Sequence, residues 1–118
     1  MALSVREVKD TLEANIYAGE QWIDRLVQNA CGSDLMSDVL AFVKDQSVLL
    51  TGLVNTQVIR TAEMMDMICV VFVRGKKPDQ QIIDLANERE IVLLVTEHPM
   101  FTACGLLYEK GLRGGLAR

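Results

Sequence analysis

The middle and the end of the chain alternate between short, wholly apolar runs and longer segments in which apolar residues recur every three or four positions. The clear apolar runs are residues 47–51, 68–73 and 91–95, and weaker ones are residues 14–17 and 26–31. Strands that are apolar on both sides are typical of a buried parallel sheet, and the longer segments have the spacing of amphipathic helices. The pattern therefore predicts an α/β fold, a mostly parallel sheet flanked by helices on both faces.

Polar residues and prolines predict where the helices begin. Ser4 and Glu7 have the spacing of a capping box, so the first helix is expected to begin after Ser4. Ser33 or Asp34 is expected to cap a second helix, whose predicted buried face includes Leu40. Further helix starts are predicted at Asn55, Pro78 and Pro99.

Length and composition bound the number of domains. With 118 residues, of which 50% are hydrophobic, the chain is long enough for one packed core and is apolar for a small soluble domain. We predict one domain over residues 1–111 and a flexible tail over residues 112–118, which show no core pattern. A subunit interface explains the excess of apolar residues best, so a homo-oligomer, most simply a dimer, is expected.

Three methionines, Met64, Met65 and Met67, cluster at the end of one predicted helix and are the candidate interface residues. Methionine side chains are flexible and often form adaptable partner surfaces. Core packing beside a loose helix end explains the same cluster equally well, so both interpretations stay open.

Charge and cysteine spacing argue against several classes of protein. A net charge of −4 argues against nucleic-acid binding, which needs a basic face. No apolar run is long enough to cross a bilayer and residues 1–9 have no signal-peptide pattern, so a cytoplasmic protein without membrane contact is expected. Cys31, Cys69 and Cys104 form no Cys-x-x-Cys pair, so neither a disulfide framework nor a metal site is expected, and no cofactor is predicted.

Three loops follow the carboxyl ends of the three clear strands, and in a parallel sheet such loops meet at one edge, where these folds bind ligands. The loop at residues 31–34 joins them if its strand is also parallel. Helix starts with free N–H groups, small donors and cations favour an anion such as phosphate or a nucleotide. The candidate ligand-binding residues are Thr51, Gly52, Asn55, Arg74, Gly75, Lys76, Thr96 and His98.

Two plainer interpretations of this edge stay open. The polar residues can serve only as helix caps and solubilising charges. Alternatively, a second subunit or a partner protein covers the edge and satisfies the same groups.

Motifs for catalysis are absent from the chain. Neither the phosphate-binding G-x-x-x-x-G-K-[ST] pattern nor the dinucleotide-binding G-x-G-x-x-G pattern occurs. His98 is the only histidine, and acid–base work needs partners that the sequence does not identify. No catalytic residue is therefore predicted, and an enzyme that uses His98 with Cys31 is the remaining alternative.

Four stretches carry a resemblance to a known family: SDLMSDVLAFV, VLLTGLVNTQVIRTAEMMDM, VVFVRGKKPDQQIIDLA and IVLLVTEHPMFTACGLLYEKGL. In pattern and order they resemble the DRTGG domain family, which is similar to the N-terminal domain of HPr kinase/phosphorylase. The resemblance implies a regulatory or assembly role without catalysis. It also implies a link, for some stand-alone members, to hydrogenase and electron-transfer systems.

The chain departs from the residues that give this family its name. It has Val54 and Asn55 where many members carry Asp-Arg, and Arg74 and Gly75 where many carry Gly-Gly. A ligand held by the Asp-Arg pair in other members therefore lacks that pair here.

Two hypotheses of function follow. The first is a non-catalytic regulatory or ligand-sensing domain, homodimeric, that binds a small anion or nucleotide or docks on a partner protein. The second is a structural assembly subunit without a ligand.

Overall fold

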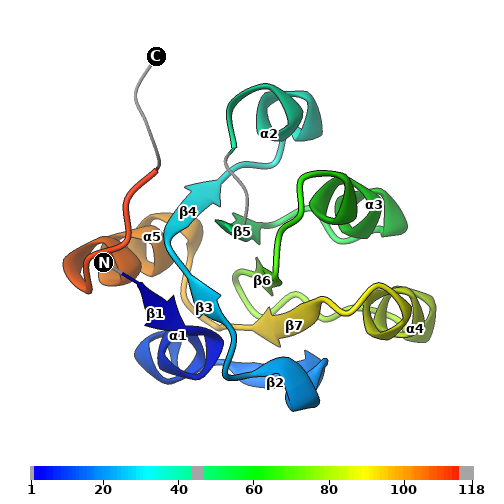
Figure 1. Ribbon diagram of the computed structural model, residues 1–118, viewed down its shortest axis with the longest axis horizontal. Coiled ribbons are helices and arrows are strands. Elements are labelled where there is room, and N and C mark those ends of the chain that lie inside the picture. Colours follow the sequence, from blue (N-terminus) through cyan, green and yellow to red (C-terminus); the bar gives the residue numbers. More distant parts are fainter. Residues whose placement is uncertain (1, 44–46, 115–118) are drawn as a thin grey trace.

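The structure, a computed structural model, describes residues 2–43 and 47–114 as a three-layer arrangement of helices around a sheet (Figure 1). In chain order the elements are β1 (Leu3–Ser4), α1 (Val5–Leu12), β2 (Asn15–Ala18), the 3-10 turn η1 (Glu20–Trp22), β3 (Leu26–Val27), β4 (Asn29–Gly32), α2 (Met36–Phe42), β5 (Ser47–Thr51), α3 (Thr56–Met64), β6 (Cys69–Phe72), α4 (Gln80–Glu88), β7 (Val92–Val95) and α5 (Met100–Glu109).

The main sheet has five strands in the order β2-β7-β6-β5-β4. Strands β4, β5, β6 and β7 are parallel, and β2 pairs with β7 in the antiparallel direction at the far edge. The predicted α/β fold with a mostly parallel sheet is thus confirmed. The weak apolar run at residues 26–31 is two strands instead of one, because β3 pairs with β1 in a separate two-stranded sheet while β4 joins the main sheet.

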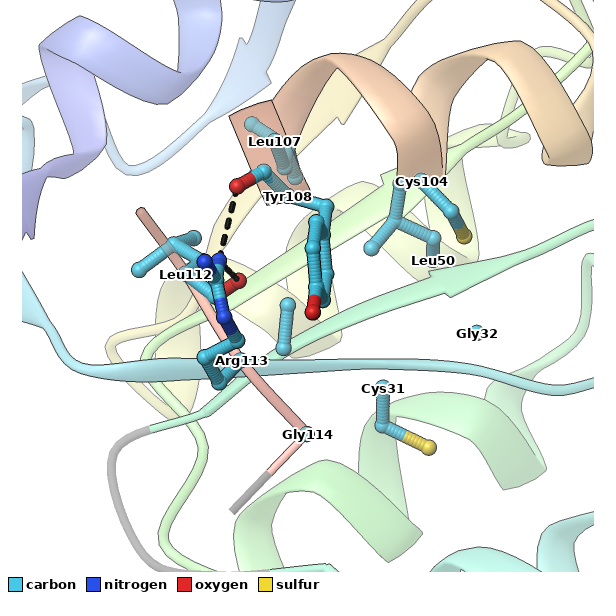
Figure 2. Close-up of a pocket in the computed structure, with 10 residues that line it drawn as sticks. Cys31, Gly32, Leu50, Cys104, Leu107, Tyr108, Leu112, Arg113 and Gly114 are labelled. Carbon is cyan, nitrogen blue, oxygen red and sulfur yellow. Dashed lines mark hydrogen bonds between the residues drawn. The ribbon is translucent and has the colours of Figure 1, made fainter. Parts of the chain in front are cut away.

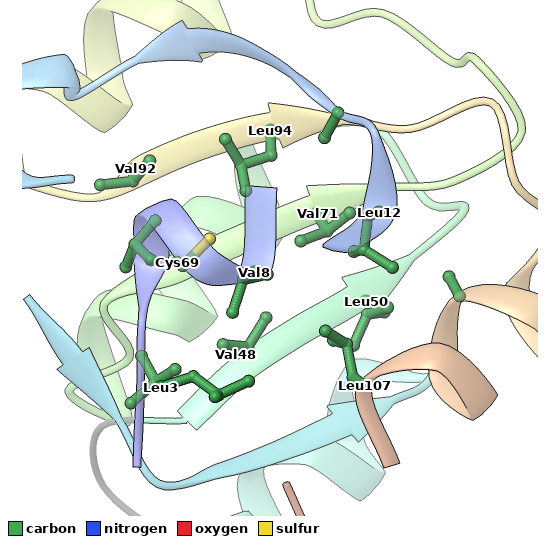
Figure 3. Close-up of a cluster of buried hydrophobic side chains, with 14 of the residues drawn as sticks. Leu3, Val8, Leu12, Val48, Leu50, Cys69, Val71, Val92, Leu94 and Leu107 are labelled. Carbon is green, nitrogen blue, oxygen red and sulfur yellow. The ribbon is translucent and has the colours of Figure 1, made fainter. Parts of the chain in front are cut away.

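Two apolar layers hold the sheet between the helices. Helices α1 and α5 pack on one face in a cluster that includes Val8, Leu50 and Leu107 (Figure 3). Helices α2, α3 and α4 pack on the other face in a cluster that includes Ile59 and Phe72. Because β5, β6 and β7 are buried on both faces, their sequences show no polar side.

The predicted helix starts are confirmed at α1 and α3. The Ser4 side chain accepts from the Glu7 backbone N–H at 3.1 Å, and the Ser4 N–H donates to the Glu7 carboxylate at 2.9 Å, which completes the capping box. The Asn55 side chain accepts from the Val58 N–H at 3.1 Å.

Two other expected helix starts are wrong. Helix α4 is capped by Asp79, whose carboxylate accepts from the Ile82 N–H at 3.0 Å, so Pro78 lies outside the helix instead of in its first turn. Helix α2 is capped by neither Ser33 nor Asp34, since its N-cap position is Leu35 and has no side-chain bond.

The second helix is also less buried than its spacing indicated. Leu40, predicted in its buried face, is 42% exposed, whereas Met36 and Val39 do pack in the core. Helix α2 is only seven residues long and lies beside β4 at the end of the sheet, so little of the sheet remains for it to cover (Figure 1).

Part of the segment predicted as a tail has contacts with the domain. Leu112 is buried, and the Arg113 carbonyl accepts from the Ala30 N–H at 2.9 Å, so residues 112–114 lie along the outer side of β4. The other four residues of that segment, 115–118, lie outside the described part of the chain.

Candidate functional site

The loops after the four parallel strands meet at one edge of the sheet, which we call the carboxyl edge. It consists of residues 33–35, 52–55, 73–77 and 96–99. The first of these loops belongs to the edge because β4 is parallel to β5, the condition on which its inclusion depended. The carboxyl edge is therefore built from four segments that are well separated in sequence.

An aspartate from the first loop bonds to the end of the neighbouring strand β5 and to the loop after it. One carboxylate oxygen of Asp34 accepts from the Gly52 N–H at 2.7 Å and from the Thr51 hydroxyl at 3.0 Å. The Gly52 hydrogen bond contributes most to lowering the pKa of Asp34 below its ordinary value of 3.8. The Thr51 hydrogen bond and the positive charges of Lys76 and Arg74 lower the pKa further, whereas burial opposes them. Asp34 was expected as a possible helix cap and as part of the loop at residues 31–34. The structure places its carboxylate in the hydrogen-bond network of the carboxyl edge, and the helix-cap prediction is wrong.

A lysine in the third loop, which follows β6, forms a hydrogen bond to the second loop, which follows β5. The Lys76 ammonium donates to the Gly52 carbonyl at 2.9 Å. A side chain at Gly52 would meet the Arg74 guanidinium at 3.4 Å and the Asp34 carboxylate at 3.6 Å. Both polar groups of the Gly52 backbone are thus occupied, and the oppositely charged Arg74 and Asp34 side chains both lie where a side chain at Gly52 would be.

The loop after β6 turns sharply over residues 73–76. Its two central residues both have positive φ, 57° at Arg74 and 68° at Gly75, and the Lys76 N–H donates to the Val73 carbonyl at 3.3 Å. The turn is bonded to the next loop, since the Arg74 N–H donates to the His98 carbonyl at 2.9 Å and the Gly75 N–H to the Thr96 carbonyl at 2.8 Å. Arg74 therefore holds a backbone conformation that favours glycine.

Several predicted ligand-binding residues are already bonded within the protein. Thr96 is fully buried, and its hydroxyl donates to the Leu12 carbonyl at 2.7 Å and accepts from the His98 N–H at 3.3 Å. The His98 ring nitrogen Nε2 lies 3.3 Å from the Glu13 carboxylate. Thr51 is also fully buried. The structure thus brings the predicted residues to one edge. It leaves the exposed Arg74 and Lys77 side chains as the groups most open to a ligand, because the Lys76 ammonium is bonded to the Gly52 carbonyl.

An open groove of about 510 Å³ runs along the carboxyl edge beside the start of α4. Its walls carry two lysines, and its lining residues are Gly52, Val54, Lys76, Lys77, Asp79 and Ile82. The prediction included Gly52 and Lys76 but missed Lys77 and Asp79. Lys77 could have been predicted from its place in the run Lys76-Lys77, which lies in the loop that follows a strand.

The candidate interface methionines are separated by the fold. Met64 is 69% exposed, whereas Met67 is 4% exposed and packs in the core between α3 and the sheet. Met65 lies between these extremes. An interface role for Met67 is therefore wrong, because its side chain completes the core of its own subunit.

A second cavity, which sequence reasoning did not predict, lies at the β4 edge between β4, α5 and residues 112–114 (Figure 2). Its volume is about 150 Å³, and it is lined mainly by apolar groups, including Leu50 and Leu107. The Arg113 guanidinium lies 3.7 Å from the centre of the Tyr108 ring and donates to the Tyr108 carbonyl at 2.8 Å.

Two cysteines also line this cavity from opposite sides of β4 (Figure 2). Burial raises the pKa of the Cys31 thiol and that of the Cys104 thiol. Both are free cysteines that stay protonated at neutral pH, which makes them poor nucleophiles.

Among the residues that the structure describes, no three His, Cys, Asp or Glu side chains are grouped as metal ligands would be. In the same part of the chain, no helix has the length and apolar character needed to cross a bilayer.

The sequence match to a family spans most of these elements. The DRTGG domain matches residues 7–109, from α1 to the end of α5. The chain belongs to the DRTGG domain family. The resemblance in the sequence is thereby confirmed, and the carboxyl edge described above is the edge of a DRTGG domain.

One solved structure shows the same fold in a larger protein. The DRTGG domain described here is similar to the CBS and DRTGG domains of the regulatory region of Clostridium perfringens pyrophosphatase, complexed with its activator diadenosine tetraphosphate. The match has a TM-score of 0.70 at 19% identity and covers 88% of this chain but only 45% of that one. At that identity the likeness shows a shared fold. No curated protein matches the chain.

Proposed function

We propose that this DRTGG domain is a non-catalytic regulatory domain that binds a small anion, such as inorganic phosphate or the phosphate group of a nucleotide, at the carboxyl edge. The observation that carries the proposal is the convergence of Arg74, Lys76 and Lys77 beside a groove of about 510 Å³. These cations belong to a chain whose net charge is −4, and within the carboxyl edge they outnumber the carboxylates of Asp34 and Glu97.

The backbone at Arg74 supports a role for its guanidinium. With φ at 57°, this residue is in the left-handed region, where a residue with a side chain is less stable than glycine by about 1–2 kcal/mol. Strained residues of this kind cluster at functional sites. The side chain is exposed, so packing does not account for arginine at this position.

The pyrophosphatase relative supports the class of ligand. That regulatory region is complexed with diadenosine tetraphosphate, a nucleotide with several phosphate charges. An anion of this class suits a groove with two lysines on its walls.

Burial raises the pKa of the Cys31 and Cys104 thiols, so neither is an activated nucleophile at neutral pH. The proposed role makes no use of the contact between the His98 ring and the Glu13 carboxylate. A regulatory domain needs only binding, which the carboxyl edge offers without a nucleophile or a general base.

The experiment that tests ligand binding compares Arg74→Gly with the wild type in thermal unfolding with inorganic phosphate or ATP. A ligand at about a hundred times its Kd stabilises a protein by about 2.7 kcal/mol. We expect ATP or phosphate to stabilise the wild type, and Arg74→Gly to lose most of that effect while its own stability is unchanged or higher, because glycine relieves the backbone strain.

Arg60→Ala is the matched control. Arg60 is exposed on α3, so its removal changes the net charge equally without touching the carboxyl edge. A wild type that neither ligand stabilises, or an Arg60→Ala variant that loses as much binding as Arg74→Gly, would contradict the proposal.

A second candidate function, assembly without a ligand, is favoured by exposed apolar side chains. Phe101 is 89% exposed, Met64 69% and Tyr108 59%. Burying them between two copies would stabilise a homodimer, which needs about 1,200–2,000 Å² of interface in total. Sedimentation equilibrium should then give twice the mass of the 13.1 kDa chain. Met64→Glu places a charge on the exposed end of α3, and Phe101→Glu places one on the exposed start of α5. Whichever variant lowers the mass to that of one chain identifies the helix that forms the dimer interface.

A further inference from the structure

We infer that the Asp34 carboxylate is an internal competitor for the anion site, so that a phosphate-bearing ligand binds by displacing it and thereby releases the turn between β4 and α2. The inference rests on the proposed function, because it concerns the same edge. It adds what the ligand must displace and which segment responds.

The groups around the Asp34 carboxylate are those that bind phosphate in proteins. A backbone N–H donates to it from Gly52 at 2.7 Å, and a hydroxyl donates from Thr51 at 3.0 Å. Two cations, Lys76 and Arg74, lie close enough to stabilise its negative charge. A backbone amide, a hydroxyl, a lysine and an arginine together form a site for an oxyanion.

Helix capping does not explain the position of the Asp34 side chain. It stands immediately before α2 but does not cap it, because the N-cap is Leu35 and has no side-chain bond. The Ser33 hydroxyl instead accepts from the Leu35 N–H at 3.0 Å, so the turn satisfies itself locally. What the Asp34 carboxylate does is join the β4–α2 turn to the start of the next loop.

Displacement therefore has a defined structural result. Among the described residues, the Asp34 side chain makes the only side-chain hydrogen bonds that join the β4–α2 turn to the end of β5 and the loop after it. A phosphate oxygen that takes the Gly52 N–H and the Thr51 hydroxyl removes both bonds at once. The turn at residues 33–35 then keeps the Ser33 N–H bond to the Leu50 carbonyl, at 3.0 Å, as its backbone attachment to β5.

The test measures binding of inorganic phosphate and of ATP to the wild type, Asp34→Asn and Asp34→Ala by calorimetric titration. Removing an ordinary binding residue weakens binding, whereas removing an internal competitor strengthens it. We expect Asp34→Ala to bind at least about tenfold more tightly than the wild type. Asp34→Asn should be intermediate, because its side-chain carbonyl still accepts the Gly52 hydrogen bond but carries no charge.

Asp38→Asn is the matched control for the lost negative charge. Asp38 is exposed on α2, four residues from Asp34, and it makes no hydrogen bond to the carboxyl edge among those described. The affinity of the Asp38→Asn variant for inorganic phosphate or ATP should differ from that of the wild type by less than about twofold, because an exposed charge at a distance is screened by salt.

Hydrogen exchange gives a second readout of displacement. Saturating phosphate should speed amide exchange at residues 33–35 in the wild type and should have no such effect in Asp34→Ala, where the turn is already released.

The outcomes separate this inference from the proposed function. If neither probe binds the wild type or any Asp34 variant, the proposed function fails. If the wild type binds and the Asp34 variants bind equally or more weakly, the edge is an anion site but Asp34 is not its competitor. Asp34→Asn decides the matter if Asp34→Ala does not fold.

Discussion

The carboxyl edge and the β4 edge of the same sheet are stabilised in opposite ways. At the carboxyl edge, the side chains of Asp34, Lys76 and Thr96 each bond to backbone groups of another loop or element. At the β4 edge, Leu50, Leu107 and Leu112 surround a cavity of about 150 Å³, and the Arg113 guanidinium donates to the Tyr108 and Leu112 carbonyls beside it. One region is ordered by hydrogen bonds and the other by packing.

The difference shows which region can respond to a ligand. Hydrogen bonds between a charged side chain and backbone groups near solvent can be exchanged for equivalent bonds to an anion at little net change in free energy. Apolar packing has no such substitute, because a side chain that leaves the core loses its burial. We therefore expect mutations at the β4 edge to change stability most, and mutations at the carboxyl edge to change ligand response most.

Leu107→Ala should have the largest effect on stability. Leu107 is 1% exposed and forms a wall of the cavity, so its truncation enlarges a void that already exists. We expect a loss of about 2–5 kcal/mol in the free energy of unfolding, measured by urea denaturation. Leu106→Ala, on the same helix but only partly buried, should lose clearly less. Equal losses at the two positions would show that packing does not order the β4 edge.

Thr96→Val should have the next largest effect. Valine has nearly the same shape, but it removes the donor to the Leu12 carbonyl at 2.7 Å and leaves that buried carbonyl without its partner. We expect a loss of about 1–3 kcal/mol in the free energy of unfolding. Thr102→Val, at an exposed site on α5, should stay within about 0.5 kcal/mol of the wild type. If Thr96→Val left the free energy of unfolding unchanged, hydrogen bonds would not be what orders the carboxyl edge.

Gly75→Ala and Gly105→Ala should change stability in opposite directions. Gly75 has a φ of 68°, so alanine there is strained and should lower stability by about 1–2 kcal/mol. Gly105 lies within α5, and nothing is within 4 Å of an added β-carbon, so alanine should raise stability by about 0.5–1 kcal/mol. Thermal unfolding of both variants checks the pair, and a shift in the same direction for both would contradict it.

Asp34→Asn should have the smallest effect on stability, and one that depends on pH. Because the folded pKa of Asp34 lies below its ordinary value of 3.8, the ionised carboxylate stabilises the fold above that pH. The contribution is lost as the pH falls through the folded pKa. We expect Asp34→Asn to be less stable than the wild type by at most about 1 kcal/mol at pH 7, since the side chain is exposed. The difference in free energy of unfolding between the two proteins, measured by urea denaturation, should vanish at pH values below the folded pKa. A difference that increases as the pH falls would contradict a lowered pKa for Asp34.

The sequence alone determined the α/β fold and most of its elements. Strands β5, β6 and β7 were predicted because each is buried on both faces, so their runs of apolar residues are unmistakable. The starts of α1 and α3 were predicted because capping is a local interaction, made within four residues of the chain. The position of the carboxyl edge followed from the parallel direction of the strands.

Only the tertiary structure decided how the polar residues of that edge are used. Asp34 has the sequence position of a helix cap, but the Gly52 N–H, 18 residues away, binds its carboxylate instead. Met64 and Met67 belong to one helix end, yet one is exposed and the other completes the core. Leu112 lies in a segment with no apolar period and is buried nonetheless. Local patterns report which conformation a segment favours, whereas the partner of a single side chain depends on contacts between segments that are distant in sequence, and these exist only once the sheet has formed.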